Sequence, residues 1–174
     1  IVSPQTKRAA AEAIEAVGGA YVDVAVMSPV RPALTAAPLL LSGPHAEKAT
    51  ARLCGIGFSQ VRVLDGPVGA ASAVKMIRSV MVKGMEALTA ECLMAAVAAG
   101  VDAEVIASLD ASKPADGWAA RSDYNLDRMM LHGGRRAEEM REVVATLEEL
   151  GVEPAMSRAT VAWQAAIGAV GVSP

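Results

Sequence analysis

The sequence predicts a mainly helical protein with a small α/β part on its N-terminal side. Residues of apolar type make up 53% of the 174 residues, yet only 3% are aromatic, and the abundant alanine, leucine and methionine favour helices. Before residue 68, short β-branched runs alternate with helical stretches, which is typical of an α/β arrangement. After Gly69 the sequence is almost uninterrupted helix-forming residues to about Ala99. These observations together indicate the fold class.

In the N-terminal part, capping residues, glycines and prolines mark the ends of the expected helices and strands. Ser3 and Pro4 are suited to the first positions of a helix, and Gly18 and Gly19 would end it after Val17. The β-branched and apolar runs that glycines and prolines bound are expected to be strands. We therefore expect strands at 21–26, 38–41 and 61–64, a proline-rich loop at 28–38 and a second helix at 45–55.

The C-terminal part is expected to be entirely helical. Gly100 would end the long helix, and Asp102 could cap the next one. The pair Gly133 and Gly134 predicts a break between two later helices. We expect helices at 69–99, 102–109, 126–132, 135–150 and 158–169, with a loop at 112–123. The change of pattern predicts two domains, 1–68 and 69–174.

Composition excludes several classes of function. A net charge of −3 and a pI near 5.4 disfavour a nucleic-acid surface. The longest charge-free run, from Cys92 to Val101, is too short to span a membrane, so we expect a soluble cytosolic protein. Cys54 and Cys92 lack metal or redox spacing and are interpreted as buried, reduced thiols. Neither histidine lies in a cluster with metal-ligand spacing, so we predict no metal.

One junction between a strand and a helix is a candidate for a functional site. The strand at 61–64 leads into a turn punctuated by Gly66 and Gly69, and Lys75 follows early in the long helix. Glycines allow a close backbone approach at such a turn. Lys75 and Arg78 are costly in an apolar helix unless they meet an anion or water. The alternative is that both side chains extend to solvent while their stems pack.

Three segments resemble a known superfamily. The segment from Gly66 to Ser79, GPVGAASAVKMIRS, resembles the catalytic motif of the β-hydroxyacid dehydrogenases, which include 6-phosphogluconate and 3-hydroxyisobutyrate dehydrogenases. DVAVMSP at 23–29 resembles the substrate loop of that superfamily, and TAAPLLLSG at 35–43 resembles the strand that follows. The segment at 127–140 resembles a divergent phosphogluconate-dehydrogenase-like branch. The order and spacing of the segments also match.

The resemblance implies roles for particular residues. Lys75 corresponds to the catalytic acid/base, and Met27, Ser28, Arg78 and Ser79 correspond to substrate-binding positions. The set implied to contact the cofactor, NAD or NADP, is Gly69 and Lys75.

A cluster after residue 130 leaves two interpretations open. His132 and Arg135 could hold a substrate carboxylate or a cofactor phosphate, since arginine matches such anions. They could equally belong to a solvated helix start. We interpret Arg136 in the second way, as an exposed residue that pairs with Glu138 and Glu139.

The departures from the family pattern are informative. Ala71 replaces the third glycine, Ser79 replaces an asparagine, and Met27 begins a changed substrate loop. Val82 stands where 6-phosphogluconate dehydrogenase has a glutamate, which argues against that particular reaction. No glycine-rich GxGxxG turn follows an opening strand. We therefore interpret the chain as the C-terminal portion of a longer dehydrogenase: an all-helical domain preceded by the last strands of a Rossmann-type α/β domain.

Two hypotheses for function remain. The first is an NAD(P)-dependent oxidoreductase that acts on a small hydroxy acid and forms a homodimer through its helical domain. The alternative is a non-catalytic helical dimerisation or interaction module, because the long helix and the Ala-rich segment at 161–167 carry much apolar surface.

Overall fold

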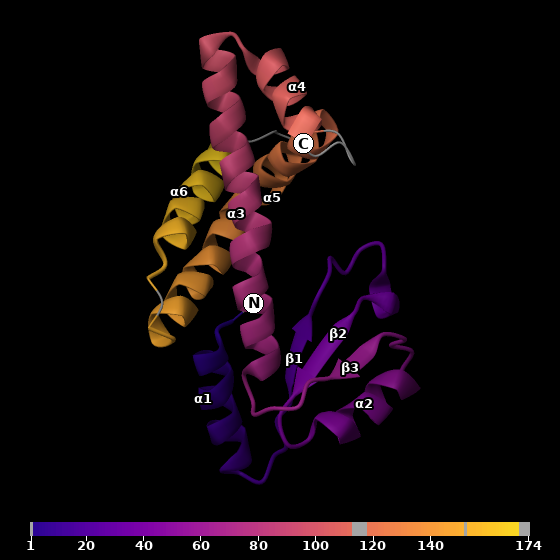
Figure 1. The fold of residues 1–174 in the computed structure, drawn as a ribbon. Coiled ribbons are helices and arrows are strands. Elements are labelled where there is room, and N and C mark those ends of the chain that lie inside the picture. The colour runs from indigo at the N-terminus through magenta and orange to yellow at the C-terminus, as the bar shows by residue number, and fades with distance from the viewer. Residues whose placement is uncertain (1, 113–117, 152, 171–174) are drawn as a thin grey trace. The chain divides into compact units, whose positions relative to one another are not determined.

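A computed structural model describes residues 2–112, 118–151 and 153–170 of the chain (Figure 1). The described residues form two compact units. Unit 1 comprises residues 1–78 and 145–151, and unit 2 comprises residues 79–144 and 152–174. These units are compact groups of residues that contact one another within the described structure. The domain boundary predicted between residues 68 and 69 concerns the plan of a larger protein and stays a prediction.

Unit 1 is built on a three-stranded sheet in the order β1-β2-β3. The central strand β2 (Leu39–Ser42) is buried along its whole length. It runs antiparallel to β1 (Asp23–Val26), where Asp23 lies opposite Ser42, and parallel to β3 (Val61–Val63). A strand covered on both faces needs apolar residues throughout, and the run of three leucines in β2 meets that requirement. The three predicted strands are confirmed, each with slightly different ends.

Alternate residues of β2 pack on opposite faces of the sheet, as the pleat requires. On one face, Leu40 packs with Ala25 and with Ala71 in the first turn of α3 (Ala70–Ala99). On the other face, Leu39 and Leu41 pack with Ala46 at the start of α2 (Ala46–Gly55). The sheet therefore fixes the beginning of α3 directly, through its buried central strand.

The remaining elements of unit 1 follow the local sequence signals. Ser3 caps α1 (Pro4–Glu15): its hydroxyl accepts a hydrogen bond from the Thr6 amide at 3.2 Å. Arg8 on α1 forms an ion pair with Glu149 at the end of α5. The loop between β1 and β2 contains one short 3₁₀ turn, η1 (Leu34–Ala36). The sequence predicted the α1 cap because capping needs only residues close in the chain.

Unit 2 is helical throughout its described residues. It contains α3 from Ser79 onward, α4 (Asp102–Ser112), α5 (Trp118–Glu149) up to residue 144, and α6 (Ala155–Val170). Gly100 ends α3 with a left-handed backbone (φ 70°), and its amide bonds the Val97 carbonyl. The predicted stop at Gly100 is thus confirmed, and so is the fold class: mostly helical, with a small sheet.

The predicted break at Gly133 and Gly134 is wrong, because α5 runs through both glycines without interruption. The predicted loop at 112–123 is also wrong from Trp118 onward, where the residues are helical; 113–117 lie outside the described residues. Gly133 instead meets α6. A Cβ atom built on Gly133 would lie 2.3 Å from the Gln164 carbonyl oxygen and 2.7 Å from the Gly168 Cα. The glycine is therefore required for a close helix crossing, which outweighs its poor helix propensity.

The interpretation of the cysteines as buried is also wrong. Cys54 and Cys92 are both exposed and unbonded to sulfur. Cys54 lies in the last turn of α2, and Cys92 lies on α3. An apolar sequence context indicated burial, but the position of each residue around its helix decides it.

The two neighbouring glycines of α5 should respond to alanine in opposite ways. Gly133→Ala should lower the free energy of unfolding by more than about 2 kcal/mol, since the new methyl meets backbone that cannot yield. Gly134→Ala meets nothing within 4 Å and should raise the free energy by roughly 0.5 to 1 kcal/mol through helix propensity. Urea denaturation of both variants measures this. Equal effects of the two substitutions would contradict the proposed crossing.

Candidate active site

The candidate site in unit 1 lies where the end of β1 meets the first turns of α3. Lys75 is on the second turn of that helix, and its Nζ donates a hydrogen bond to the carbonyl oxygen of Val26 at 2.5 Å. Val26 is the last residue of β1. The sequence placed Lys75 beside a strand–helix junction, and the structure ties its amine to the strand that precedes the predicted substrate loop.

A buried carboxylate holds this junction together. Asp23 is fully buried at the start of β1 and accepts hydrogen bonds from both the amide and the hydroxyl of Ser72, at 2.9 and 2.6 Å. Ser42 on β2 donates to Asp23 at 3.4 Å, and its oxygen accepts from the Ala71 amide at 3.0 Å. Two strands thus supply the cap of α3, where a negative charge also suits the helix dipole.

Sequence reasoning missed Asp23 and Ser72 as site-forming residues. Asp23 lies in the segment 23–29 that resembles a substrate loop, but the sequence signals for helix capping concern the residue just before a helix. Here the capping carboxylate is 49 positions away from Ser72. Lys7 on α1 lies 3.5 Å from the same carboxylate, so the charge of Asp23 is also partly balanced.

A pocket of about 220 Å³ opens beside Lys75. Its lining comes from α1, β1 and α3 and consists of Val2, Lys7, Val24, Ala25, Val26, Ser72, Lys75 and Met76. Two lysines, Lys7 and Lys75, line the pocket, and Lys7 lies 3.5 Å from the buried Asp23 carboxylate. The two amines suit a small anion.

The other residues predicted in this half lie near the same junction but make different contacts. Met27 is partly buried and packs against the cluster of Ala25, Leu40 and Ala71. The Ser28 hydroxyl donates to the Pro29 carbonyl at 3.1 Å, and the Arg78 side chain is exposed. Nothing in these contacts assigns a substrate role, so the predictions for Met27, Ser28 and Arg78 stay predictions.

Unit 2 contains a separate chain of polar contacts that reaches two predicted residues. Ser79 is 7% exposed and accepts a hydrogen bond from Lys83 at 3.3 Å. Lys83 pairs with Glu139 at 2.9 Å, and the second carboxylate oxygen of Glu139 accepts from Arg135. Arg135 is 63% exposed, at the outer end of this chain. The structure therefore links Ser79 and Arg135 through Lys83 and Glu139, which sequence reasoning had not placed in a site. His132 is exposed on α5.

Burial changes the ionisation of this pair. Desolvation lowers the pKa of Lys83, although Glu139 acts in the opposite direction. Burial by itself would raise the pKa of Glu139, but the hydrogen bond and charge of Lys83 outweigh it, so the pKa of Glu139 is lowered. Each group thus favours the ionised form of the other.

A second buried pair adjoins the first. Arg136 is 3% exposed and forms an ion pair with Glu86, whose carboxylate also accepts from Gln164 on α6 at 2.8 Å. The interpretation of Arg136 as an exposed partner of Glu138 and Glu139 is therefore wrong. The exposed Arg135 and the buried Arg136 are consecutive residues on different sides of α5, and the sequence alone does not show which face of α5 is covered.

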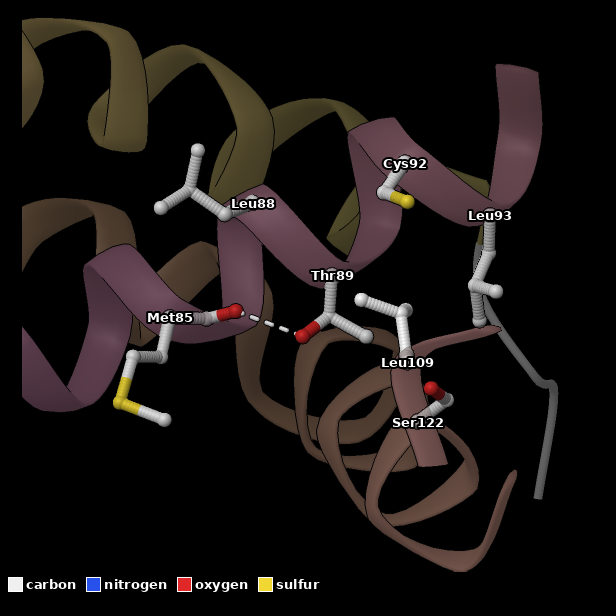
Figure 2. Close-up of a pocket in the computed structure, with 7 residues that line it drawn as sticks. All are labelled: Met85, Leu88, Thr89, Cys92, Leu93, Leu109 and Ser122. Carbon is white, nitrogen blue, oxygen red and sulfur yellow. Dashed lines mark hydrogen bonds between the residues drawn. The ribbon is translucent and has the colours of Figure 1, made fainter. Parts of the chain in front are cut away.

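Unit 2 also contains an apolar pocket of about 220 Å³, shown in Figure 2. The α3 residues Met85, Leu88, Thr89, Cys92 and Leu93 line it, together with Leu109 of α4 and Ser122 of α5. Two hydrogen bonds fix the Thr89 hydroxyl: it donates to the Met85 carbonyl at 2.7 Å and accepts from the Asn125 side-chain amide. The lining is almost entirely apolar and offers no charged group for catalysis.

The described residues contain neither a metal-binding cluster nor a helix that could cross a membrane. No group of three or more His, Cys, Asp and Glu side chains there is arranged to hold a metal ion. Within the same residues, every helix is too short or too polar to cross a membrane.

Comparison with known proteins supports the resemblance. The chain is 39% identical to a conserved hypothetical protein from Sinorhizobium meliloti 1021, with a TM-score of 0.86 over 99% of this chain and 58% of that one. It is 33% identical to a conserved protein of unknown function whose structure is described as similar to 3-hydroxyacid dehydrogenases; the TM-score is 0.80, over 95% of this chain and 62% of that one. The chain resembles the C-terminal portion of the hydroxyacid dehydrogenase-like proteins.

Three more findings complete the comparison. Residues 96–167 match a family model described as a domain of unknown function, DUF1932. A 3-hydroxyisobutyrate dehydrogenase from Salmonella typhimurium has a TM-score of 0.67 at 20% identity, over 96% of this chain and 61% of that one, which shows likeness of fold alone. No curated protein matches the chain. The chain spans about three fifths of the length of each of these solved structures.

The turn before α3 does not fit a dinucleotide pyrophosphate. Such a group needs available amide N–H groups at a helix N-terminus. The amides of Ala71 and Ser72 already bond Ser42 and Asp23, and the buried Asp23 charge would repel a phosphate. Gly69 packs against α1: a Cβ atom there would lie 3.2 Å from Pro4. A contact of Gly69 with the cofactor stays a prediction.

Removal of the Asp23 carboxylate should loosen the junction that carries Lys75. We expect Asp23→Ala to lower the free energy of unfolding by about 3 kcal/mol, since it strands the Ser72 amide and hydroxyl in a buried position. Asp65→Ala, at an exposed aspartate in the turn before α3, serves as control and should change it by less than about 0.5 kcal/mol. Thermal or urea unfolding gives the comparison, and equal small effects would refute the capping role.

Proposed function

We propose that this chain is the C-terminal portion of an NAD(P)-dependent dehydrogenase that oxidises a small 3-hydroxy acid, with Lys75 as its proton-transfer group. The observation that carries the proposal is the position of Lys75. Its side chain lines a pocket, and its amine donates a hydrogen bond to the Val26 carbonyl. The similarity to hydroxyacid dehydrogenase-like proteins supports the reaction class.

The proposed chemistry needs a base that accepts the proton of the substrate 3-hydroxyl. A neutral Lys75 amine can donate one N–H to the Val26 carbonyl while its lone pair points to that hydroxyl. The O–H proton then moves to Nζ as the carbon gives up a hydride. The nicotinamide, when bound, supplies the hydride acceptor. In the reverse direction Lys75 returns the proton to the carbonyl oxygen.

The remaining predicted residues are proposed to bind substrate. Ser28 and Ser79 would donate hydrogen bonds to the hydroxyl or carboxylate oxygens, and Arg78 would offer its charge to the carboxylate. Met27 would lie beside them in the substrate loop, and His132 and Arg135 would supply further charge for an anionic group. We propose that residues outside this chain hold the cofactor pyrophosphate, because the turn before α3 does not fit it.

Loss of Lys75 should abolish turnover without loss of fold. In the full-length protein we expect Lys75→Met to lower kcat by at least about a hundredfold, as removal of a general base does. Lys48→Met on α2 is the control, because Lys48 is an exposed lysine. The assay measures initial rates for a panel of 3-hydroxy acids with NAD⁺ and with NADP⁺, and cofactor binding by fluorescence. Turnover close to that of the unmodified protein in Lys75→Met would refute the proposal.

We also propose that the helical unit forms a homodimer, which incorporates the alternative hypothesis. Large apolar side chains are exposed on α3: Met81 is 65% and Leu88 is 53% exposed. These two residues are seven apart and so share one face of the helix, and Leu88 also lines the apolar pocket. A second copy that covers this face would remove that surface from water.

A charge on that face should dissociate the dimer. We expect Leu88→Lys to reduce the mass measured by size-exclusion chromatography with light scattering from dimer to monomer at micromolar concentration. Val97→Lys is the matched control, since Val97 is 65% exposed but nine residues along α3, on the opposite side of the helix. A monomer in the unmodified protein, or equal dissociation by both variants, would contradict this interface.

A further inference from the structure

Lys7 is the second amine of the pocket in unit 1, and the proposed proton transfer does not use it. It lies in the first turn of α1 and lines the same pocket as Lys75. Its side chain is only 20% exposed. An ammonium withdrawn from water to this extent needs a negative partner, because the burial of an unpaired charge is costly.

The carboxylate of Asp23 satisfies Lys7 only in part. The Nζ of Lys7 lies 3.5 Å from Oδ1 of Asp23, which is longer than a charge-assisted hydrogen bond of about 2.7 to 2.9 Å. The same carboxylate already accepts three hydrogen bonds, two from Ser72 and one from Ser42. Among the residues that the structure describes, the Lys7 amine has no other polar partner. Since an ammonium has three N–H donors, Lys7 can donate to an acceptor in the pocket.

The other walls of the pocket indicate what kind of anion fits. Val2, Val26 and Met76 present apolar side chains to it. Its volume of about 220 Å³ exceeds that of a cavity of roughly 150 Å³ that binds benzene, so it has room for an organic anion of about six to eight non-hydrogen atoms. A short carbon chain suits these walls, whereas a polyhydroxylated chain would place hydroxyls against them without hydrogen-bond partners.

We propose that Lys7 is a substrate-binding residue whose ammonium binds the carboxylate of a short-chain aliphatic hydroxy acid. This inference rests on the proposed function, in which Lys75 accepts the proton of the substrate hydroxyl. It gives the two amines of the pocket different roles, Lys75 at the hydroxyl and Lys7 at the carboxylate. Arg78, the other cation proposed for the carboxylate, is exposed and does not line this pocket.

Butyrate and butyramide test the charge directly, because they have nearly the same size and shape but only butyrate is an anion. Calorimetric titration of the full-length protein should show tighter binding of butyrate. Lys7→Met should weaken butyrate binding by about tenfold, the size of a hydrogen bond to a charged group, and should leave butyramide binding unchanged. Lys7→Arg keeps the positive charge and should keep the preference for butyrate.

The pair of probes also separates binding from stability. Lys7→Met removes the cation beside Asp23, and any loosening of the pocket that follows would weaken butyrate and butyramide alike. Lys48→Met, at an exposed lysine of α2 outside the pocket, is the matched control and should change neither affinity. Equal weakening of both probes by Lys7→Met, or an unchanged affinity for butyrate, would overturn the inference.

Initial rates separate this inference from the proposed function. Lys7→Met should raise the KM for an aliphatic 3-hydroxy acid about tenfold with little change in kcat, because its contact with the carboxylate is the same before and during the reaction. Lys75→Met is measured in parallel. If Lys75→Met abolishes turnover while Lys7→Met leaves both the KM and the butyrate affinity unchanged, the inference fails and the dehydrogenase proposal stands. If the unmodified protein oxidises no 3-hydroxy acid, the proposed function fails, and the two probes still decide whether Lys7 binds a carboxylate.

Discussion

The candidate active site depends on the buried carboxylate of Asp23. It bonds the amide and hydroxyl of Ser72, and Ser42 completes the cap on the first turn of α3. Lys75 follows Ser72 by three residues on the same helix, so the bonds that fix the first turn of α3 also fix the backbone position of Lys75. The helix dipole strengthens these bonds, because the negative charge lies at its positive end. The position of Lys75 therefore follows from capping of α3 by the sheet.

The same cap explains why this helix N-terminus is unsuited to a phosphate. Amides that would cradle an anion in a dinucleotide fold are engaged by the chain's own oxygens. The helix start thus has one of two uses, an anion site or an anchor for a side chain further along. In this chain it is an anchor for Lys75, which lies beside a pocket of about 220 Å³.

Unit 2 shows how polar groups can organise a helical core. Lys83, Glu86, Arg136 and Glu139 are all at most 8% exposed, and they pair across α3 and α5. Alongside them, Gly133 and Gly168 bring α5 and α6 into backbone contact. Close backbone approach limits sliding of the helices, and the ion pairs admit few alternative registers. The combination gives each polar side chain a defined partner.

The sequence by itself determined the features that depend on neighbours in the chain. Ser3 caps α1, Gly100 ends α3, the leucine run forms the central strand, and Lys75 follows a strand–helix turn, because capping, turns and strand patterns are local. The tertiary structure alone decided which charged residues are buried and which glycines belong inside a helix. Arg135 and Arg136 are adjacent in sequence, yet one is exposed and the other buried, since the second faces α3. Likewise Gly133 lies inside α5 because α6 crosses there, and packing between segments far apart in the chain outweighs local propensity.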